Sequence, residues 1–307
     1  MAIDKHQHLI QQLLPGKVVW VAISTISCAI FVLLHAVFGH LQVNLFHAEM
    51  GIAQTVDVTS EIASNNPMNF EVPKYFQAKT IKSVQLPNVG KVIALTFDDG
   101  PWPETTEKIL ATLKQEKIKA TFFMIGQPLK YFPEIGKKVL ADGHAIANHT
   151  MHHWYKNMSP LVAQREIEDT AKIIKEVLNI ETAYFRPPGG MLSNGLVAYS
   201  LSHNQSVAMW SVDSKDSHPH RPTPAAMIQT VLANATPGGI VLMHDGGGNH
   251  NNTAKALPEM ITKLRAQGYK FVTIPELLEL ASLPPATQSA QGISNPLPTK
   301  SSASDQI

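Results

Sequence analysis

Residues 92–101 read VIALTFDDGP, and this stretch decides how the rest of the chain is interpreted. VIALTF (92–97) is a short apolar run containing β-branched and aromatic residues, which predicts a buried strand. The predicted strand ends in two adjacent carboxylates, Asp98 and Asp99, followed by Gly-Pro. Alone, Asp-Asp-Gly-Pro is typical of a solvated turn, because these residue types favour turns. Whether the carboxylates are instead a functional pair depends on their surroundings.

Six further segments resemble this strand, and helical patterns separate them. They are 120–126, 144–148, 182–187, 206–213, 240–244 and 270–274. Between them lie segments such as 159–178, where Ser159-Pro160 supplies a helix start and apolar residues recur at helical spacing. Seven alternating strand and helix pairs predict an α/β fold with a mostly parallel sheet, either doubly wound or closed as a barrel. In both architectures functional side chains collect where strands end.

The N-terminal part of the chain has a different composition. Residues 18–39 are almost entirely apolar and contain no Lys, Arg, Asp or Glu, which predicts a transmembrane signal anchor. Lys5 and Lys17 precede it, and no Lys or Arg follows before residue 60, so the bias of positive charge places residues 1–17 in the cytoplasm. A cleaved signal peptide, which would release the protein by secretion, and a buried soluble helix are the alternatives.

The flanks of the predicted domain lack sustained periodicity. Residues 40–84 contain an Asn-Asn-Pro sequence and a further proline, Pro73, and we expect a stalk there. Residues 283–307 are rich in Pro, Ser, Ala and Gln, which predicts a disordered tail. The expected folded domain is therefore 85–282, held on the extracytoplasmic side of a cell membrane by one N-terminal helix.

Charge and cysteine content narrow the classes of function. The chain has 25 Lys and Arg against 24 Asp and Glu, a net charge of +1, which provides no overall field to attract nucleic acid. Cys28 is the only cysteine, so an internal disulfide and a cysteine-based zinc module are both excluded. A metal site would have to use His, Asp or Glu.

Titratable residues follow five of the predicted strands. His149 and His153 are four residues apart, and in a helical turn their rings would lie on one face, with Asp99 adding a carboxylate from a neighbouring strand end. Two imidazoles and one carboxylate match a hydrolytic zinc site. A lone HxxxH is more often a surface pair, but here it follows a predicted strand and accompanies the Asp98-Asp99 pair.

These segments, taken in order, resemble a known family. TFDDGP (96–101), HTMHH (149–153), RPPGG (186–190), Asp213 and LMH (242–244) are similar to the five motifs of the polysaccharide deacetylases, the NodB-homology domain of carbohydrate esterase family 4. The resemblance covers the whole 85–282 segment. It implies an irregular (β/α)7-type barrel.

The resemblance also implies a role for each matching residue in the water-consuming half of the reaction. It makes Asp99, His149 and His153 the ligands of a divalent metal, with Zn²⁺ preferred over Co²⁺ or another ion. It makes Asp98 the catalytic base that takes a proton from water. His152 is the alternative to His153 as ligand if the turn is wound differently.

The remaining matches concern the leaving group and the oxyanion. The resemblance implies that His244 is the general acid, that Asp213 stabilises its charged form and that Arg186 keeps Asp98 ionised. It places the oxyanion and the substrate beside Gly189, Pro188 and Leu242.

Two positions depart from the family pattern. Gly189 stands where the family usually has Tyr, and Ser217 follows Asp216 where the family usually has Trp. Neither position holds the expected metal, base or acid, so we expect activity with a more open sugar-binding groove. Trp210 and Trp154 are candidates to replace the missing rings.

The sequence therefore predicts a metal-dependent deacetylase that hydrolyses N-acetyl groups of an extracytoplasmic polysaccharide. Peptidoglycan N-acetylglucosamine is the favoured substrate, because the expected anchor would hold the domain beside the cell wall. Chitin-type oligomers are the second candidate substrate. An O-acetyl esterase, a small-molecule amidase and a non-catalytic carbohydrate-binding protein are the alternatives on the same fold.

Overall fold

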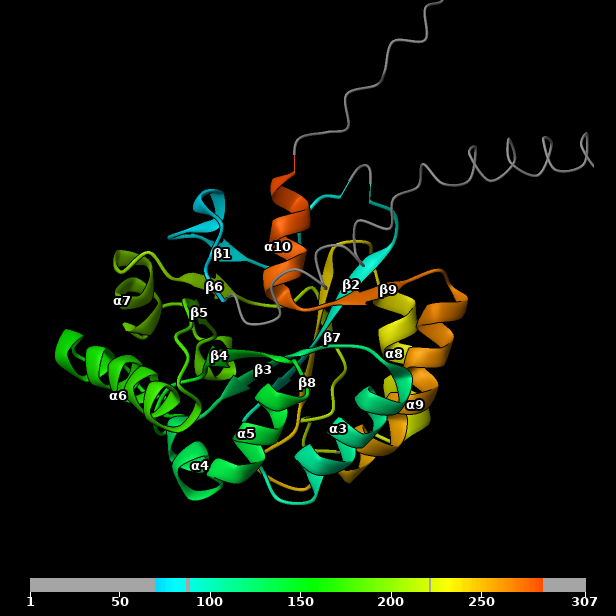
Figure 1. Ribbon diagram of the computed structural model, residues 1–307, viewed down its shortest axis with the longest axis horizontal. Helices are drawn as coiled ribbons and strands as arrows, with labels where there is room; N and C mark the ends of the chain where they lie inside the picture. The colour runs from blue at the N-terminus through cyan, green and yellow to red at the C-terminus, as the bar shows by residue number, and fades with distance from the viewer. Residues whose placement is uncertain (1–69, 87–88, 221, 284–307) are drawn as a thin grey trace, which may run out of the picture. The chain divides into compact units, whose positions relative to one another are not determined.

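Strand β2 (Val92–Asp98) lies at the centre of the sheet in the computed structural model, which describes residues 70–86, 89–220 and 222–283 (Figure 1). All seven of its residues are buried. It pairs with β8 (Gly239–His244) along one edge, and with β9 (Lys270–Val272) and β3 (Thr121–Met124) on the other. A strand that is hydrogen-bonded at both edges and covered on both faces requires an uninterrupted apolar sequence, as VIALTF provides.

The sheet contains nine strands within the described residues, and every ladder in it is parallel. The other strands are β1 (Thr80–Ile81), β4 (Ala145–Asn148), β5 (Tyr184–Phe185), β6 (Ser206–Ala208) and β7 (Val212–Asp213). Their order is β1-β6-β5-β4-β3-β2-β8-β7, with β9 beside β2. The predicted parallel α/β fold is confirmed. It takes the form of a half-barrel, because no ladder between described residues joins β1 to β7.

Helices cover the sheet along its length (Figure 1). They are α3 (Thr105–Glu116), α4 (Gly126–Tyr131), α5 (Pro133–Ala141), α6 (Pro160–Leu178), α7 (Leu196–Ser202), α8 (Pro224–Asn234), α9 (Asn251–Ala266) and α10 (Ile274–Ser282), with single 3-10 turns η1 (Lys74–Phe76) and η2 (Pro188–Gly190). Helix α6 begins as predicted: Ser159 accepts a hydrogen bond from the Val162 amide, and Pro160 occupies the first turn.

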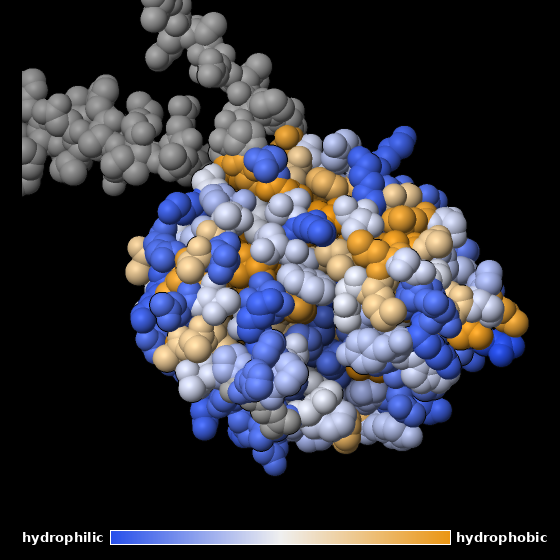
Figure 2. Space-filling model, turned by 180° about the vertical axis from the view of Figure 1, so that it is seen from behind, coloured by the Kyte–Doolittle hydropathy of each residue, from blue (hydrophilic) through white to orange (hydrophobic). Residues whose placement is uncertain are grey.

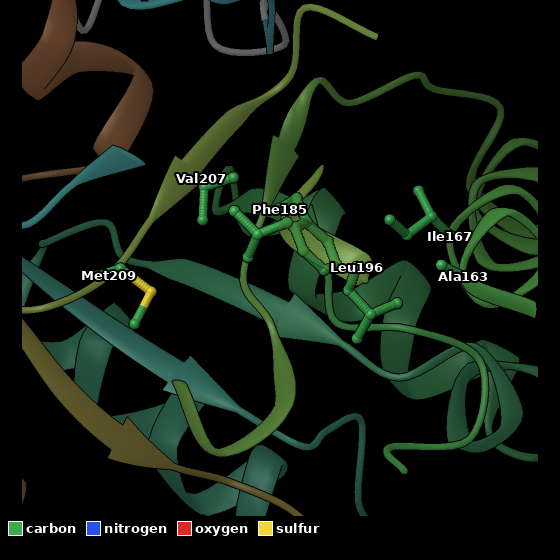
Figure 3. Close-up of a cluster of buried hydrophobic side chains, with 7 residues drawn as sticks. Ala163, Ile167, Phe185, Leu196, Val207 and Met209 are labelled. Carbon is green, nitrogen blue, oxygen red and sulfur yellow. The ribbon is translucent and has the colours of Figure 1, made fainter. Parts of the chain in front are cut away.

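A buried apolar cluster holds β5 and β6 against α6 and α7 (Figure 3). Ala163 and Ile167 of α6 approach Phe185 of β5 and Leu196 of α7, while Val207 and Met209 add the side chains around β6. Burial of such side chains stabilises by about 1.5–3 kcal/mol each. The cluster fixes β5 immediately before Arg186, so packing here positions a predicted site residue.

One predicted strand is wrong. Residues 206–213 form two strands, β6 and β7, which lie in different parts of the sheet: β6 pairs with β1 and β5, and β7 pairs with β8. The chain leaves the ladder between them because the main-chain carbonyls of Ala208 and Met209 bond to the Arg186 side chain. A continuous apolar run cannot reveal this break.

Folded structure also precedes residue 85, where we expected the domain to begin. Residues 70–84, expected to belong to the stalk, contain η1 and β1, and five of their apolar side chains are buried: Phe70, Val72, Phe76, Ile81 and Val84. The Val84 amide bonds to the Gly238 carbonyl, and Ser83 bridges to Gly239. This segment supplies the outermost strand beside β6.

The expected membrane anchor, residues 18–39, lies outside the described residues, as do the cytoplasmic segment 1–17, the rest of the stalk and the tail from 284. Among the residues that are described, no helix is both long enough and apolar enough to cross a bilayer. On the face shown in Figure 2, hydrophobic residues form small patches separated by hydrophilic ones. Helix α10 ends at Ser282.

The contact between segment 80–86 and β8 can be tested at Gly238. This residue has φ +76°, and a Cβ there would lie 2.0 Å from the Val84 carbonyl oxygen. We expect Gly238→Ala to lower the free energy of unfolding by about 2–4 kcal/mol, the sum of backbone strain and overpacking. Urea unfolding followed by tryptophan fluorescence measures it.

Gly90→Ala is the matched control, because Gly90 has φ +81° with nothing within 4 Å of the added Cβ. Gly90→Ala should lower the free energy of unfolding by about 1–2 kcal/mol, from backbone strain alone. Equal losses in the two variants would contradict the packing of segment 80–86 on the domain.

Candidate active site

The C-terminal end of β2 carries a buried ion pair between Asp98 and Arg186. Arg186 follows β5 and is fully buried; its Nη1 donates to Asp98 Oδ1 at 2.6 Å and to Thr96 Oγ1 at 2.9 Å. Its Nε and Nη2 donate to the carbonyls of Ala208 and Met209 at 2.7 and 3.1 Å. The predicted pairing of Arg186 with Asp98 is present. Four fixed acceptors hold the guanidinium, so the Asp98 carboxylate is held in one orientation.

Asp99, His149 and His153 converge beside Asp98. Asp99 Oδ1 lies 3.4 Å from His149 Nε2 and 3.1 Å from His153 Nε2, and one ligand atom from each residue falls within 4.8 Å of the others. Asp99 Oδ1 is buried and has no hydrogen-bond partner among the described residues. Burial opposes ionisation of Asp99, but His149 and His153 outweigh it and hold its pKa far below the ordinary value.

This donor set fits a divalent metal. His149 Nδ1 lies 2.7 Å from the Arg186 carbonyl oxygen, so the nitrogen that carries the proton is fixed and Nε2 keeps a lone pair toward Asp99. The backbone that brings the two histidines together is not the predicted helical turn. It is a bend in which Thr150 and His153 adopt left-handed conformations, with φ of 70° and 59°. The predicted grouping therefore holds for a different local reason.

His152 is turned away from this group. Its backbone N–H and its Nδ1 contact the two carboxylate oxygens of Glu166, at 2.9 and 2.6 Å. Glu166 is buried on α6 and fixes the ring there. The left-handed residue at 153 thus separates two adjacent histidines, and His153 faces Asp99.

The carboxylate that contacts His244 is Asp216, and the prediction of Asp213 is wrong. Asp216 Oδ1 lies 2.8 Å from His244 Nδ1, and Asp216 Oδ2 accepts from the His244 amide at 2.7 Å and from Thr253 at 2.9 Å. Asp213 instead bonds to the backbone and the ammonium of Lys215. Both aspartates stand in the 213–217 segment, and the turn between them decides which one contacts His244.

This pair sets the charge of His244. Burial lowers the pKa of the imidazole, but the Asp216 carboxylate and, more weakly, Asp98 and Asp99 outweigh it and raise the pKa from 6.5 to about 9. His244 and Asp98 occupy opposite positions in the β8·β2 ladder. A protonated imidazole therefore faces the same site as the Asp98 carboxylate at neutral pH. His250, to which the sequence assigned no role, stacks on His244 with ring centroids 5.4 Å apart.

The residues predicted to line the oxyanion pocket come from two elements, η2 and β8. Pro188 and Gly189 form the turn η2, where Gly189 has φ +58°. Leu242 is buried in β8, level with Thr96 of β2. The ring of Tyr155 lies against Gly189, and that of Trp210 lies against Gly190. Sequence reasoning proposed Trp210 here but missed Tyr155.

Asp245 is a further buried acid that the sequence did not single out. Its Oδ2 accepts from Thr106 Oγ1 at 2.5 Å, and Gly100 leaves it room, since a Cβ there would lie 2.2 Å from the same oxygen. Burial raises its pKa to about 7; Asp99 and Asp98 add to the rise, and Thr106 opposes it. The sequence signal that could have identified Asp245 is its position directly after His244, at the end of a strand.

Comparisons with known proteins agree with this geometry. The family model for polysaccharide deacetylase matches residues 86–207. A peptidoglycan-N-acetylglucosamine deacetylase of Bacillus cereus is 39% identical over 195 residues, which cover 63% of this chain and 91% of that protein. The solved Bc1960 peptidoglycan N-acetylglucosamine deacetylase superposes with a TM-score of 0.61 and 32% identity, covering 66% and 94% of the two chains. A carbohydrate esterase family 4 pseudoenzyme of Bacillus anthracis matches with a TM-score of 0.59 and 31% identity, covering 65% and 68%.

The assignment of Asp216 predicts a measurable titration. In Asp216→Asn the His244 pKa should fall from about 9 toward its ordinary value, because only the weaker effects of Asp98 and Asp99 then oppose burial. Histidine side-chain NMR measures this, with the signal assigned by its loss in His244→Gln. Asp213→Asn is the control and should leave the titration unchanged; the reverse pattern would restore Asp213 as the partner.

The same pair has a consequence for stability. Because the folded-state pKa lies above the unfolded value, the stabilisation is fully present below pH 6.5 and is lost as the pH rises through about 9.

Proposed function

The chain belongs to the polysaccharide deacetylase family, and from this premise we propose that it is a metal-dependent enzyme that removes N-acetyl groups from peptidoglycan N-acetylglucosamine. Its relatives include deacetylases of peptidoglycan N-acetylglucosamine and of chitooligosaccharides. The observation that carries the proposal is the juxtaposition of the Arg186-bound Asp98 with the Asp99, His149 and His153 group. His149 Nε2 lies 3.7 Å from Asp98 Oδ2, so base and donor set face one space.

Asp98 is suited to act as the base. Its Oδ1 is occupied by Arg186, which leaves Oδ2 toward the donor set and able to accept a proton from water. A divalent ion held by Asp99, His149 and His153 would polarise the acetyl carbonyl and increase the acidity of the attacking water. Because His149 is oriented by the Arg186 carbonyl, the same arginine residue aligns the base and one ligand.

His244 is suited to act as the acid on the other side of the site. The amine leaves only after it gains a proton, and an imidazole with a pKa near 9 carries that proton at neutral pH. Asp216 orients the ring through Nδ1 and leaves Nε2 for the leaving nitrogen. The N–H of Gly189, in the turn η2, is the proposed donor to the oxyanion, with Leu242 and Pro188 lining the pocket.

The choice of peptidoglycan rests on similarity and on the expected location. The Bacillus cereus relative is a peptidoglycan-N-acetylglucosamine deacetylase, and the apolar segment 18–39 would place the domain beside the cell wall as a single-pass membrane protein. Protease treatment of intact wall-free cells tests this location: the domain should be digested from outside while remaining in the membrane fraction until then. Recovery of the whole domain in the culture medium would favour cleaved secretion.

Asp98→Asn tests the role of the base. We expect acetate release from N-acetylglucosamine oligomers and from intact wall to fall by about 10²–10⁴-fold, because an amide cannot take the proton of water. Asp169→Asn, which alters an exposed carboxylate on α6, is the control and should retain activity. Mass spectrometry must show a free amine on the sugar. Unchanged turnover in Asp98→Asn would overturn the mechanism, and loss of O-acetyl groups alone would indicate an esterase.

Paired histidine variants test the metal. His153→Ala should weaken Zn²⁺ binding, measured by isothermal titration calorimetry, by at least about 100-fold, since one of three ligands is removed. His152→Ala should bind Zn²⁺ as the unaltered protein does, because Glu166 holds that ring elsewhere. Chelation should abolish turnover and preserve the far-UV circular dichroism spectrum, since the buried core does not depend on the metal. Equal affinity losses in the two variants would contradict the assignment.

A further inference from the structure

Tyr155 is an exposed aromatic side chain that is nonetheless held at one place beside the candidate metal ligands. It is 65% exposed, and its ring packs edge to face on His153, with centroids 4.9 Å apart and an interplanar angle of 89°. Isolated exposed tyrosines on a surface need no explanation. This one lies in the loop between β4 and α6, two residues after His153 of the donor set.

The residues on either side of Tyr155 restrict its backbone. Glu166 binds both the amide and the ring of His152, and the Trp154 ring stacks on His152 at 4.6 Å and 11°. The ammonium of Lys156 lies 3.7 Å from the centre of the Trp154 ring. A cation over an aromatic face is attracted to the ring electrostatically, which stabilises this arrangement. The loop is therefore pinned to α6 while the Tyr155 ring itself stays open to solvent.

Gly189 provides the space that Tyr155 occupies. A Cβ at Gly189 would lie 2.7 Å from Tyr155 Cε1 and 3.1 Å from Cδ1, closer than side chains tolerate. The φ of +58° also disfavours any residue with a side chain. Gly190 shows the same arrangement with Trp210, at 2.7 Å from its ring. At the turn that carries the proposed oxyanion donor, the two glycines are thus covered by aromatic rings from other segments.

We propose that Tyr155 is a specificity-determining residue whose ring forms the wall against which the N-acetylated sugar stacks at the reaction centre, and that Gly189 is required to admit it. This rests on the proposed deacetylase function. One face of a pyranose presents C–H groups, which pack on the negatively charged face of an aromatic ring. A tyrosine ring has two rotatable bonds, so little conformational entropy is lost when it binds. Tyr155 therefore contributes to substrate binding more than to the chemical step.

Steady-state kinetics of the full-length protein with N-acetylglucosamine oligomers and added Zn²⁺ tests the role of the ring. Tyr155→Ala should raise KM by about tenfold with little change in kcat, as expected when binding is lost equally from the ground and transition states. Tyr155→Phe should restore KM, because it keeps the ring. The control is Tyr75→Ala, which removes an equally exposed tyrosine, 68% exposed, from η1.

A double-mutant cycle tests the pairing with Gly189. Gly189→Ala keeps the backbone N–H but pushes the Tyr155 ring aside, so it should raise KM about as much as Tyr155→Ala does. In the Tyr155→Ala background the same change should have little further effect on KM, because the neighbour it displaces is already absent. Equal KM increases in both backgrounds would overturn the pairing. Urea unfolding of each variant separates backbone strain from the effect on binding.

A binding measurement separates this inference from the proposed function. Calorimetric titration of Asp98→Asn with the oligomers reports affinity without turnover, and adding Tyr155→Ala should weaken that affinity by about tenfold. If the unaltered protein releases no acetate, the proposed function fails. Weaker oligomer binding in the Tyr155→Ala variant would still support the role of the Tyr155 ring in binding the sugar. If the protein releases acetate and Tyr155→Ala leaves both KM and affinity unchanged, the inference is overturned.

Discussion

The buried guanidinium of Arg186 is the constraint on which the site depends. A fully buried cation is unfavourable unless its N–H groups find acceptors. Here the acceptors come from two segments: Thr96 and Asp98 of β2, and the carbonyls of Ala208, which ends β6, and of the following Met209. The Thr96 hydroxyl in turn donates to the Val241 carbonyl, which connects β8 to the same network. Breaking such a network by removing one partner costs about 3–5 kcal/mol. The site and the half-barrel are therefore held by the same bonds.

The same constraint explains why the two halves of the proposed chemistry are aligned. The Arg186 side chain fixes Asp98, and its carbonyl fixes the His149 ring, so one residue after β5 orients both a base and a donor. His244 comes from β8 in register with Asp98 and is oriented independently by Asp216, whose own pKa is lowered by His244 and His250 although its burial opposes this. The two acid–base groups are thus oriented by separate partners.

Features that depend on neighbouring residues could be predicted from the sequence, whereas features that depend on contacts with residues distant in the sequence could not. Strand β2 and the residues at strand ends were predictable, because a strand buried on both faces leaves an apolar run and parallel strands bring their ends to one edge. The break between β6 and β7 was not, because it depends on Arg186, which is distant in sequence. Residues 70–84 lack a strong pattern because β1 has only two residues, and its stability comes from packing.

The site residues that were wrongly predicted, or missed, show the same limit at shorter range. Asp213 and Asp216 stand in one motif, and His152 and His153 are adjacent, so composition cannot choose within either pair; the turn at Lys215, with φ 66°, and the left-handed conformation of His153 do. Gly189 shows this limit most clearly. In the sequence, a glycine there meant the loss of an aromatic wall, whereas in the folded chain its missing side chain leaves room for the ring of Tyr155. An absent side chain is a structural feature only once its neighbour is known.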